Sequence, residues 1–141
     1  MVYIIDGNAL MENVKEEISR VGLRSYSTEG ISLYDGIKVT SRDKNTLNRI
    51  MSSLKTRIIS RFRFFIDSSS DNIINFNLLD LPCGYDESII QELNTFLTMG
   101  VVAVWLEEKG VEESKNYLAR SLASLETAEN LLTTRSQLMR R

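Results

Sequence analysis

The chain has 141 residues, of which 43% are hydrophobic and 26% are charged, the balance of one ordinary globular domain. Its net charge of −2 gives no general attraction to nucleic acid, and a single cysteine excludes an internal disulfide. The first residues lack the positive region of a signal peptide, so we expect a soluble and unprocessed protein.

The beginning of the chain predicts a short strand or arm and then a one-sided helix. Residues 1–5 are mainly apolar, and Asp6 or Asn8 can cap the start of the helix. This helix is predicted over about 9–21 from apolar residues at helical spacing, namely Leu10, Val14, Ile18 and Val21. Gly22 is expected to end it in the left-handed conformation.

Residues 23–40 are expected to form a long loop, because no period is sustained there and glycines recur. Ile31, Leu33 and Tyr34 make the loop too apolar for a freely solvated linker. Two interpretations stay open. These side chains pack on helices of their own chain, or they contact a neighbouring chain.

A long helix is predicted over about 42–66, capped by Ser41 and carrying an apolar stripe on one side. The other side is basic, since the stretch from residue 38 to residue 63 holds eight Lys or Arg and one Asp. Such a pattern fits a solvated face, an acidic surface on a partner, or a phosphate backbone nearby. The basic contact candidates are Arg49, Lys55, Arg57 and Arg63.

Residues 67–82 are expected to form an extended arm. Residues 67–72 are a polar turn, and the next stretch partly alternates between apolar and polar residues until Pro82 closes it. Ile73 and Phe76 are the apolar contact candidates in this arm.

Two helices are predicted for the remainder, over about 86–109 and 111–138. The first is apolar around most of its circumference, so other elements must wrap it. Its uninterrupted apolar run is shorter than the about 20 residues that cross a bilayer. Gly110 can end it, which would join the two helices into an antiparallel hairpin. The expected core positions of the last helix are Tyr117, Leu118, Ser121, Leu122, Leu125, Ala128, Leu131 and Leu132.

These elements predict a mainly α fold in a single domain over 1–141. It is a small helical bundle with a long C-terminal hairpin, an extended loop, and a short strand or arm. The chain has no histidine and one cysteine, Cys83, so a soft-metal site or a thiol–histidine nucleophile is not expected. We expect no enzyme activity, no metal and no cofactor.

A set of residues around the turn of the predicted hairpin and in its second helix carries a family resemblance. These residues are Trp105, Leu106, Gly110, Glu112, Glu113, Tyr117 and the terminal arginines. With the segments YDGI, FRFFID and NFNLLDLP, they resemble a family of small proteins encoded among the head and neck genes of tailed phages. Those phages infect Bacteroides and its relatives and include the crAss-like phages. In architecture the chain is similar to the helical head–tail adaptors, which form twelve-fold rings beneath the portal.

The resemblance implies a structural virion protein, a head–tail connector subunit in a homo-oligomeric ring of about twelve copies in the phage neck. The implied partners are the portal and further neck or tail proteins. Packaged DNA would pass nearby without sequence-specific binding, and no membrane is implied. Assembly would take place in the host cytoplasm. Two alternatives stay open: another neck or tail-completion ring protein, or a soluble helical interaction module that binds nucleic acid through its basic face.

The extended segments, 23–40 and 67–82, are expected to carry much of the subunit contact. Helices whose apolar faces are used internally would leave little surface for neighbours. The full set of contact candidates is Ile31, Leu33, Tyr34, Ile73, Phe76, Arg49, Lys55, Arg57, Arg63, Arg140 and Arg141.

Overall fold

The computed structural model describes residues 2–24, 39, 41–63, 66–70, 73–77 and 85–139. The elements are β1 (Val2–Asp6), α1 (Gly7–Arg24), the short 3-10 turn η1 (Ser41–Asp43), α3 (Lys44–Phe62), β2 (Ile66–Ser70), β3 (Ile73–Asn77), α4 (Tyr85–Glu108) and α5 (Ser114–Met139). Helices dominate these residues, so the prediction of a mainly α small bundle is confirmed. Ile31, Leu33, Tyr34, Arg140 and Arg141 lie outside the described residues.

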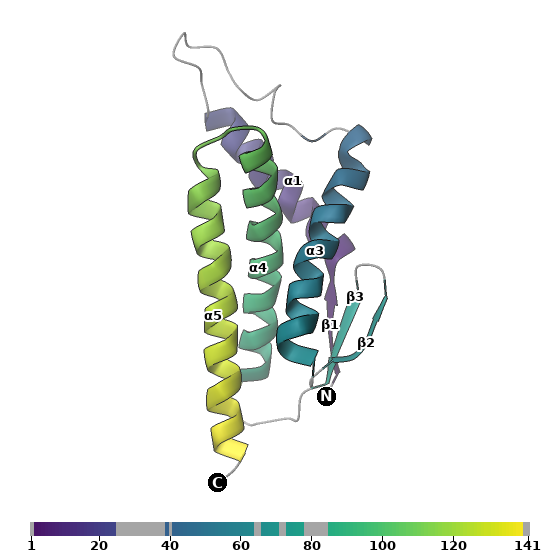
Figure 1. The fold of residues 1–141 in the computed structure, drawn as a ribbon, viewed down its shortest axis with the longest axis vertical. Helices are drawn as coiled ribbons and strands as arrows, with labels where there is room; N and C mark the ends of the chain where they lie inside the picture. Colours follow the sequence, from purple (N-terminus) through teal and green to yellow (C-terminus); the bar gives the residue numbers. More distant parts are fainter. Residues whose placement is uncertain are drawn as a thin grey trace.

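The bundle is organised around α4, which lies between α5 and α3 in Figure 1 and also packs against α1. The apolar sequence of α4 explains this central position, because a helix without a polar face needs partners on several sides. Phe96, Leu97 and Trp105 are buried, with the Trp105 side chain only 2% exposed. The predicted hairpin is present, and α4 and α5 run antiparallel side by side (Figure 1).

The turn between α4 and α5 is a Schellman motif. Gly110 has a φ of 72°, and its N–H donates to the carbonyl of Glu107, while the N–H of Val111 donates to the carbonyl of Leu106. These two hydrogen bonds satisfy carbonyls that the end of α4 would otherwise leave without partners. The predicted role of Gly110 is therefore confirmed.

Three helices approach closely at Gly100, in the middle of α4. A Cβ atom added there would lie 2.8 Å from Leu54 Cδ1 on α3 and 3.0 Å from Ser121 Oγ on α5. The Ser121 hydroxyl donates to the carbonyl of Phe96 at 3.0 Å. A residue without a side chain at this position lets α3 and α5 both pack tightly on α4.

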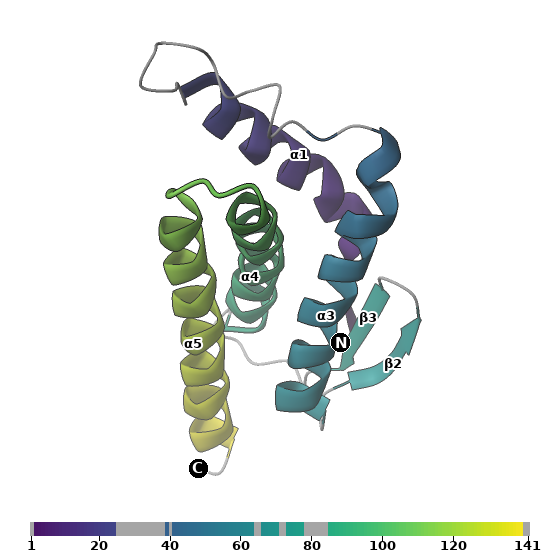
Figure 2. The ribbon, with the colours of Figure 1, turned by 45° about the horizontal axis from the view of Figure 1, so that its top comes forward.

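Helix α1 crosses α4 obliquely, as Figure 2 shows, and the Asp6 side chain caps its start. Oδ1 of Asp6 accepts hydrogen bonds from the N–H groups of Asn8, at 2.9 Å, and Ala9, at 3.4 Å. The helix continues through Gly22 to Arg24, so the predicted end at Gly22 is wrong. Residues 23 and 24, expected in the loop, are its last two residues.

Helix α3 differs from its prediction at both ends. The 3-10 turn η1 precedes it, and Asp43 rather than Ser41 holds the N-cap position, without a side-chain capping bond. The helix ends at Phe62, and Ile66 already belongs to β2, so the predicted span of 42–66 is too long. The apolar period continues past Phe62, but pairing with β3 takes Ile66 into a sheet.

The predicted arm over 67–82 is in part a β-hairpin. β3 lies between β1 and β2 in a three-stranded antiparallel sheet, beside α3 in Figures 1 and 2. Ile5 and Ile74 are register partners and both are fully buried, whereas Ile4, on the other face, is 62% exposed. The polar stretch predicted as a turn therefore contains residues 67–70 of β2, and Val2–Asp6 form a strand.

By length and composition, α4 could cross a membrane over Glu87–Glu108, and it is the one helix of the described residues that meets this test. The uninterrupted apolar run within this stretch is shorter and would not meet the test by itself. Of the apolar 18-residue window within this stretch, 67% is buried inside the molecule. Packing in the bundle core accounts for that composition.

Candidate interaction surfaces

Helix α3 presents its basic residues on the side opposite its core contacts. Its buried residues are Leu47, Ile50, Met51, Ile58 and Phe62. Arg49, Arg57 and Arg63 are exposed, and Lys55 is half-buried. At about 100° per residue, Arg49, Arg57 and Arg63 fall within one third of the helix circumference, whereas Lys55 lies well outside it. Three of the four predicted basic candidates thus share one surface, which we call the basic face.

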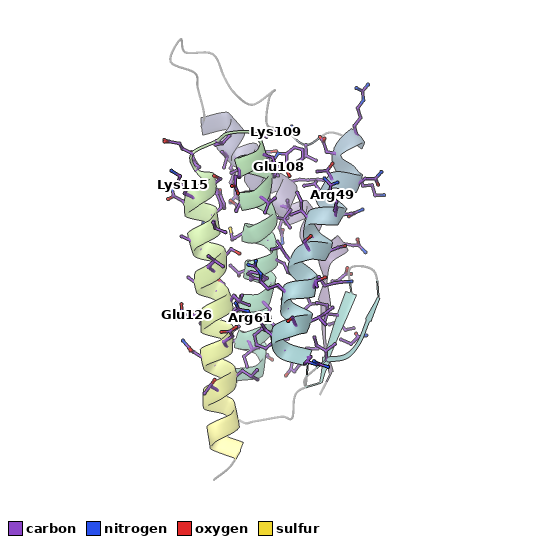
Figure 3. All side chains as sticks on the ribbon, viewed as in Figure 1. Arg49, Arg61, Glu108, Lys109, Lys115 and Glu126 are labelled. Carbon is purple, nitrogen blue, oxygen red and sulfur yellow. The ribbon has the colours of Figure 1, made fainter. Side chains whose placement is uncertain are left out.

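Another basic residue of α3, Arg61, is paired within the molecule. Its Nη1 lies 2.5 Å from Oε1 of Glu129 on α5, and Figure 3 shows Arg61 between the two helices. Both side chains are at least one-third exposed, so water weakens this ion pair and its contribution to stability is small. The pair reduces the charge that α3 offers to a partner.

The two predicted apolar candidates of the arm lie on the central strand of the sheet. The backbone of Ile73 pairs with Asp6 and Ser70, and that of Phe76 pairs with Tyr3 and Ile66. Their backbone groups are therefore within a sheet flanked on both sides, and an added strand could pair only with β1 or β2. The sequence signal for an extended conformation was correct, but alternation alone does not reveal a strand's neighbours.

The outer surface of α5 is not predicted from the sequence. Leu118 and Leu122 were expected in the core, but their side chains are 44% and 43% exposed on α5. Tyr117 and Ser121, from the same expected set, are buried as predicted. Because adjacent helical residues point about 100° apart, the predicted set was too wide to face one partner helix. The angular spread of the expected core positions around the helix was the sequence signal that some of them would be exposed.

A polar cavity of about 340 Å³ lies between α1 and α4. Its lining residues are Leu10, Asn13, Glu16, Glu17, Arg20, Gln91, Asn94, Thr95, Thr98 and Met99. Oδ1 of Asn94 is buried there without a hydrogen-bond partner in the described structure, which is unusual for a buried polar atom. The cavity lining contains no thiol, histidine or lysine.

A tyrosine hydroxyl links α5 to α1 next to this cavity. The O–H of Tyr117 donates to Oε2 of Glu17 at 3.0 Å, and Oε1 of Glu17 lies 2.8 Å from Nη1 of Arg20. The Arg120 guanidinium stands over the Tyr117 ring at 5.6 Å from its centroid. Of these contacts, the bond from Tyr117 to Glu17 attaches α1 to the hairpin, whereas the other two lie within α1 and within α5.

The part of the chain that the structure describes contains no group of three or more His, Cys, Asp or Glu side chains placed to hold a metal ion. Neither a protein-family model, nor a curated protein, nor a solved structure matches this chain.

Proposed function

We propose that this chain is a structural subunit of the neck of a tailed phage, a head–tail connector that forms a homo-oligomeric ring below the portal. The observation that carries the proposal is the α4–α5 hairpin. Three residues of the phage resemblance belong to it: Trp105 is buried near the end of α4, Gly110 forms the turn, and Tyr117 is buried at the start of α5. A rigid helical hairpin is a scaffold suited to repeated packing in a ring.

In such a ring of about twelve copies, each copy contacts two neighbours through different surfaces. Residues 23–40 and 67–82 remain our candidates for these contacts, with Ile73 and Phe76 or the outer edges of β1 and β2 contributing. The basic face, with Arg49, Arg57 and Arg63, would meet an acidic neighbour surface or line the channel through which DNA passes. The acidic neighbour is the preferred assignment, because strong phosphate contacts would hold a genome that has to slide.

Composition analysis and imaging of particles test the proposal. We expect the chain in purified virions of its phage, with its coding sequence beside portal and capsid genes, and a ring of about twelve copies in a particle reconstruction. Absence of the chain from intact particles would show that it is not a virion protein. A ring at another level of the neck would instead make it a tail-completion or other neck protein.

A second candidate function is nucleic-acid binding through the basic face. The observation that favours it is the exposure of Arg49, Arg57 and Arg63 on one side of α3. Fluorescence anisotropy with a labelled duplex at two salt concentrations would test it. A phosphate-binding surface predicts salt-dependent binding that Arg49→Glu with Arg57→Glu abolishes, whereas the connector proposal predicts negligible binding by the free protein.

A further inference from the structure

The outer face of α5 is exposed and has an apolar centre. Leu118 and Leu122 are one turn apart on it, and together with Ile4 they are the exposed large hydrophobic residues among those described. Ala119 and Ala123 lie between and beside them and are exposed too. Small side chains next to exposed leucines let a second helix approach closely, so that its leucines can fill the space above the alanines.

A charge of opposite sign stands at each end of this apolar centre. Lys115 precedes it and Glu126 comes after it, and both side chains are exposed on the side of α5 turned away from α4 (Figure 3). Neither takes part in an ion pair within the described residues. At 1.5 Å per residue the two positions are about 16 Å apart along the helix, too far to pair with each other.

We propose that this face binds the same face of a second copy, with the two α5 helices antiparallel about a two-fold axis. Centring the axis between residues 120 and 121 brings each Lys115 opposite Glu126 of the partner. The same register sets Leu118 against the partner's Ala123, and Ala119 against the partner's Leu122. Every contact then occurs twice, as an isologous interface requires.

The charges also decide the orientation of the two helices. A parallel pair in register would place Lys115 against the partner's Lys115 and Glu126 against the partner's Glu126. Like charges at both ends oppose that arrangement, whereas the antiparallel arrangement converts both contacts into attractions. Charge complementarity therefore argues for a second copy of this chain rather than an arbitrary apolar partner.

The size of the face sets the expected strength. A stable interface typically buries about 800 Å² on each partner, and one stripe of about three helical turns offers less. We therefore expect a weak dimer with a dissociation constant on the order of 100 μM, which is weak for a specific protein–protein contact. A two-fold contact does not close a cyclic ring, so this dimer is a state of the free protein and does not depend on the proposed neck function.

Charge reversal tests the pairing in the full chain by sedimentation equilibrium. Lys115→Glu and Glu126→Lys should each weaken self-association at least about tenfold, because each places like charges at both ends of the interface. The double variant should return to within about threefold of the original dissociation constant, because it restores both attractions in reversed order. Lys44→Glu, an exposed charge reversal on α3, is the matched control and should leave association unchanged.

Mixing gives a second readout. The two single variants should associate with each other although neither associates with itself, since one carries Glu at both positions and the other carries Lys at both. High salt should reduce the differences among the variants. All altered side chains are exposed, so circular dichroism should confirm an unchanged helical fold in each.

Cross-linking fixes the orientation. A zero-length carbodiimide should join Lys115 to Glu126 between labelled and unlabelled copies in an isotopically mixed sample. The proposal is overturned if the protein stays monomeric at about 1 mM, ten times the expected dissociation constant. It is equally overturned if charge reversal at positions 115 and 126 acts no more strongly than the Lys44→Glu control, or if Lys115 and Glu126 do not cross-link between copies.

Discussion

At the scale of single residues, Trp105 and Gly110 stabilise the hairpin by different means. Trp105 fills the core near the end of α4, and the Lys109 ammonium stands over its ring at 4.7 Å from the centroid. Gly110 contributes no packing, since an added Cβ would meet nothing within 4 Å, but its backbone adopts the left-handed conformation. Substitutions at these two positions therefore test packing and backbone conformation separately.

Replacing Trp105 with Ala should destabilise the protein by about 3–5 kcal/mol, because a large aromatic side chain leaves a cavity that its neighbours fill only partly. Urea unfolding followed by circular dichroism measures the loss. Leu118→Ala is the control, since Leu118 is 44% exposed, and it should cost less than about 1 kcal/mol. Equal effects of the two substitutions would show that Trp105 is not a core residue.

Replacing Gly110 with Ala should cost about 1–2 kcal/mol, the penalty for placing an L side chain in the left-handed conformation. Gly110→Asn should cost less, because asparagine tolerates this conformation better. Both variants can be compared by thermal unfolding. An alanine variant as stable as the original protein would contradict the backbone explanation, since no steric contact can be invoked at this position.

The residue-scale predictions from the sequence succeeded where a local rule decides the outcome. Glycine is the residue that most readily adopts the left-handed conformation after a helix, which is the role of Gly110. Trp105 lies in a helix that is too apolar to be solvated. Leu118 and Leu122 were misplaced because helical spacing names a set of residues without saying how many partner helices will cover them. The number of partners is a property of the assembled bundle.

At the scale of elements, the helices were easier to predict than the sheet. Each long helix carries its own period, and the central one was placed within one residue at either end. β2 contains three serines and an aspartate, residues with little preference for strands, and it forms because β3 lies beside it. Such a strand is determined by tertiary pairing, which no local pattern contains.

The attachment of α1 to the hairpin gives an element-scale prediction. Tyr117→Phe removes the hydroxyl that bonds Glu17, and we expect a loss of about 0.5–1.5 kcal/mol. Hydrogen exchange should quicken more in α1 than in α4, since α1 loses an anchor at the edge of the bundle. Glu17→Gln keeps an oxygen acceptor and should largely preserve protection in α1. Uniform acceleration along the chain would instead indicate a general loss of stability.

At the scale of the whole molecule, the residues that could carry chemistry are few. The sequence holds no histidine and one cysteine, and the described charged side chains are mainly on the surface. Among the described residues, the surfaces offered to other molecules are a basic face on α3, the outer edges of β1 and β2, and the outer face of α5. The first is expected from composition and periodicity, whereas the other two depend on how the elements assemble.

A chelator should not change the stability of the protein. We expect the same melting temperature with and without EDTA, because a metal that stabilised the fold would raise it by mass action. Elemental analysis of the purified protein should find no stoichiometric zinc, in line with the shortage of soft ligands. A fall in melting temperature on chelation, reversed by adding zinc, would contradict this expectation.

The position of β3 between β1 and β2 has a consequence for biosynthesis. β1 leaves the ribosome before its partner β3, which begins only at Ile73, so the edge of β1 stays unpaired while the intervening helices are made. Closing so long a stretch of chain is slow compared with forming a local hairpin such as β2 and β3. During that interval Ile4 and Ile5 form an apolar edge open to other nascent chains. Crowded synthesis, as on a polysome, is therefore the stage at which this protein is most exposed to misassembly.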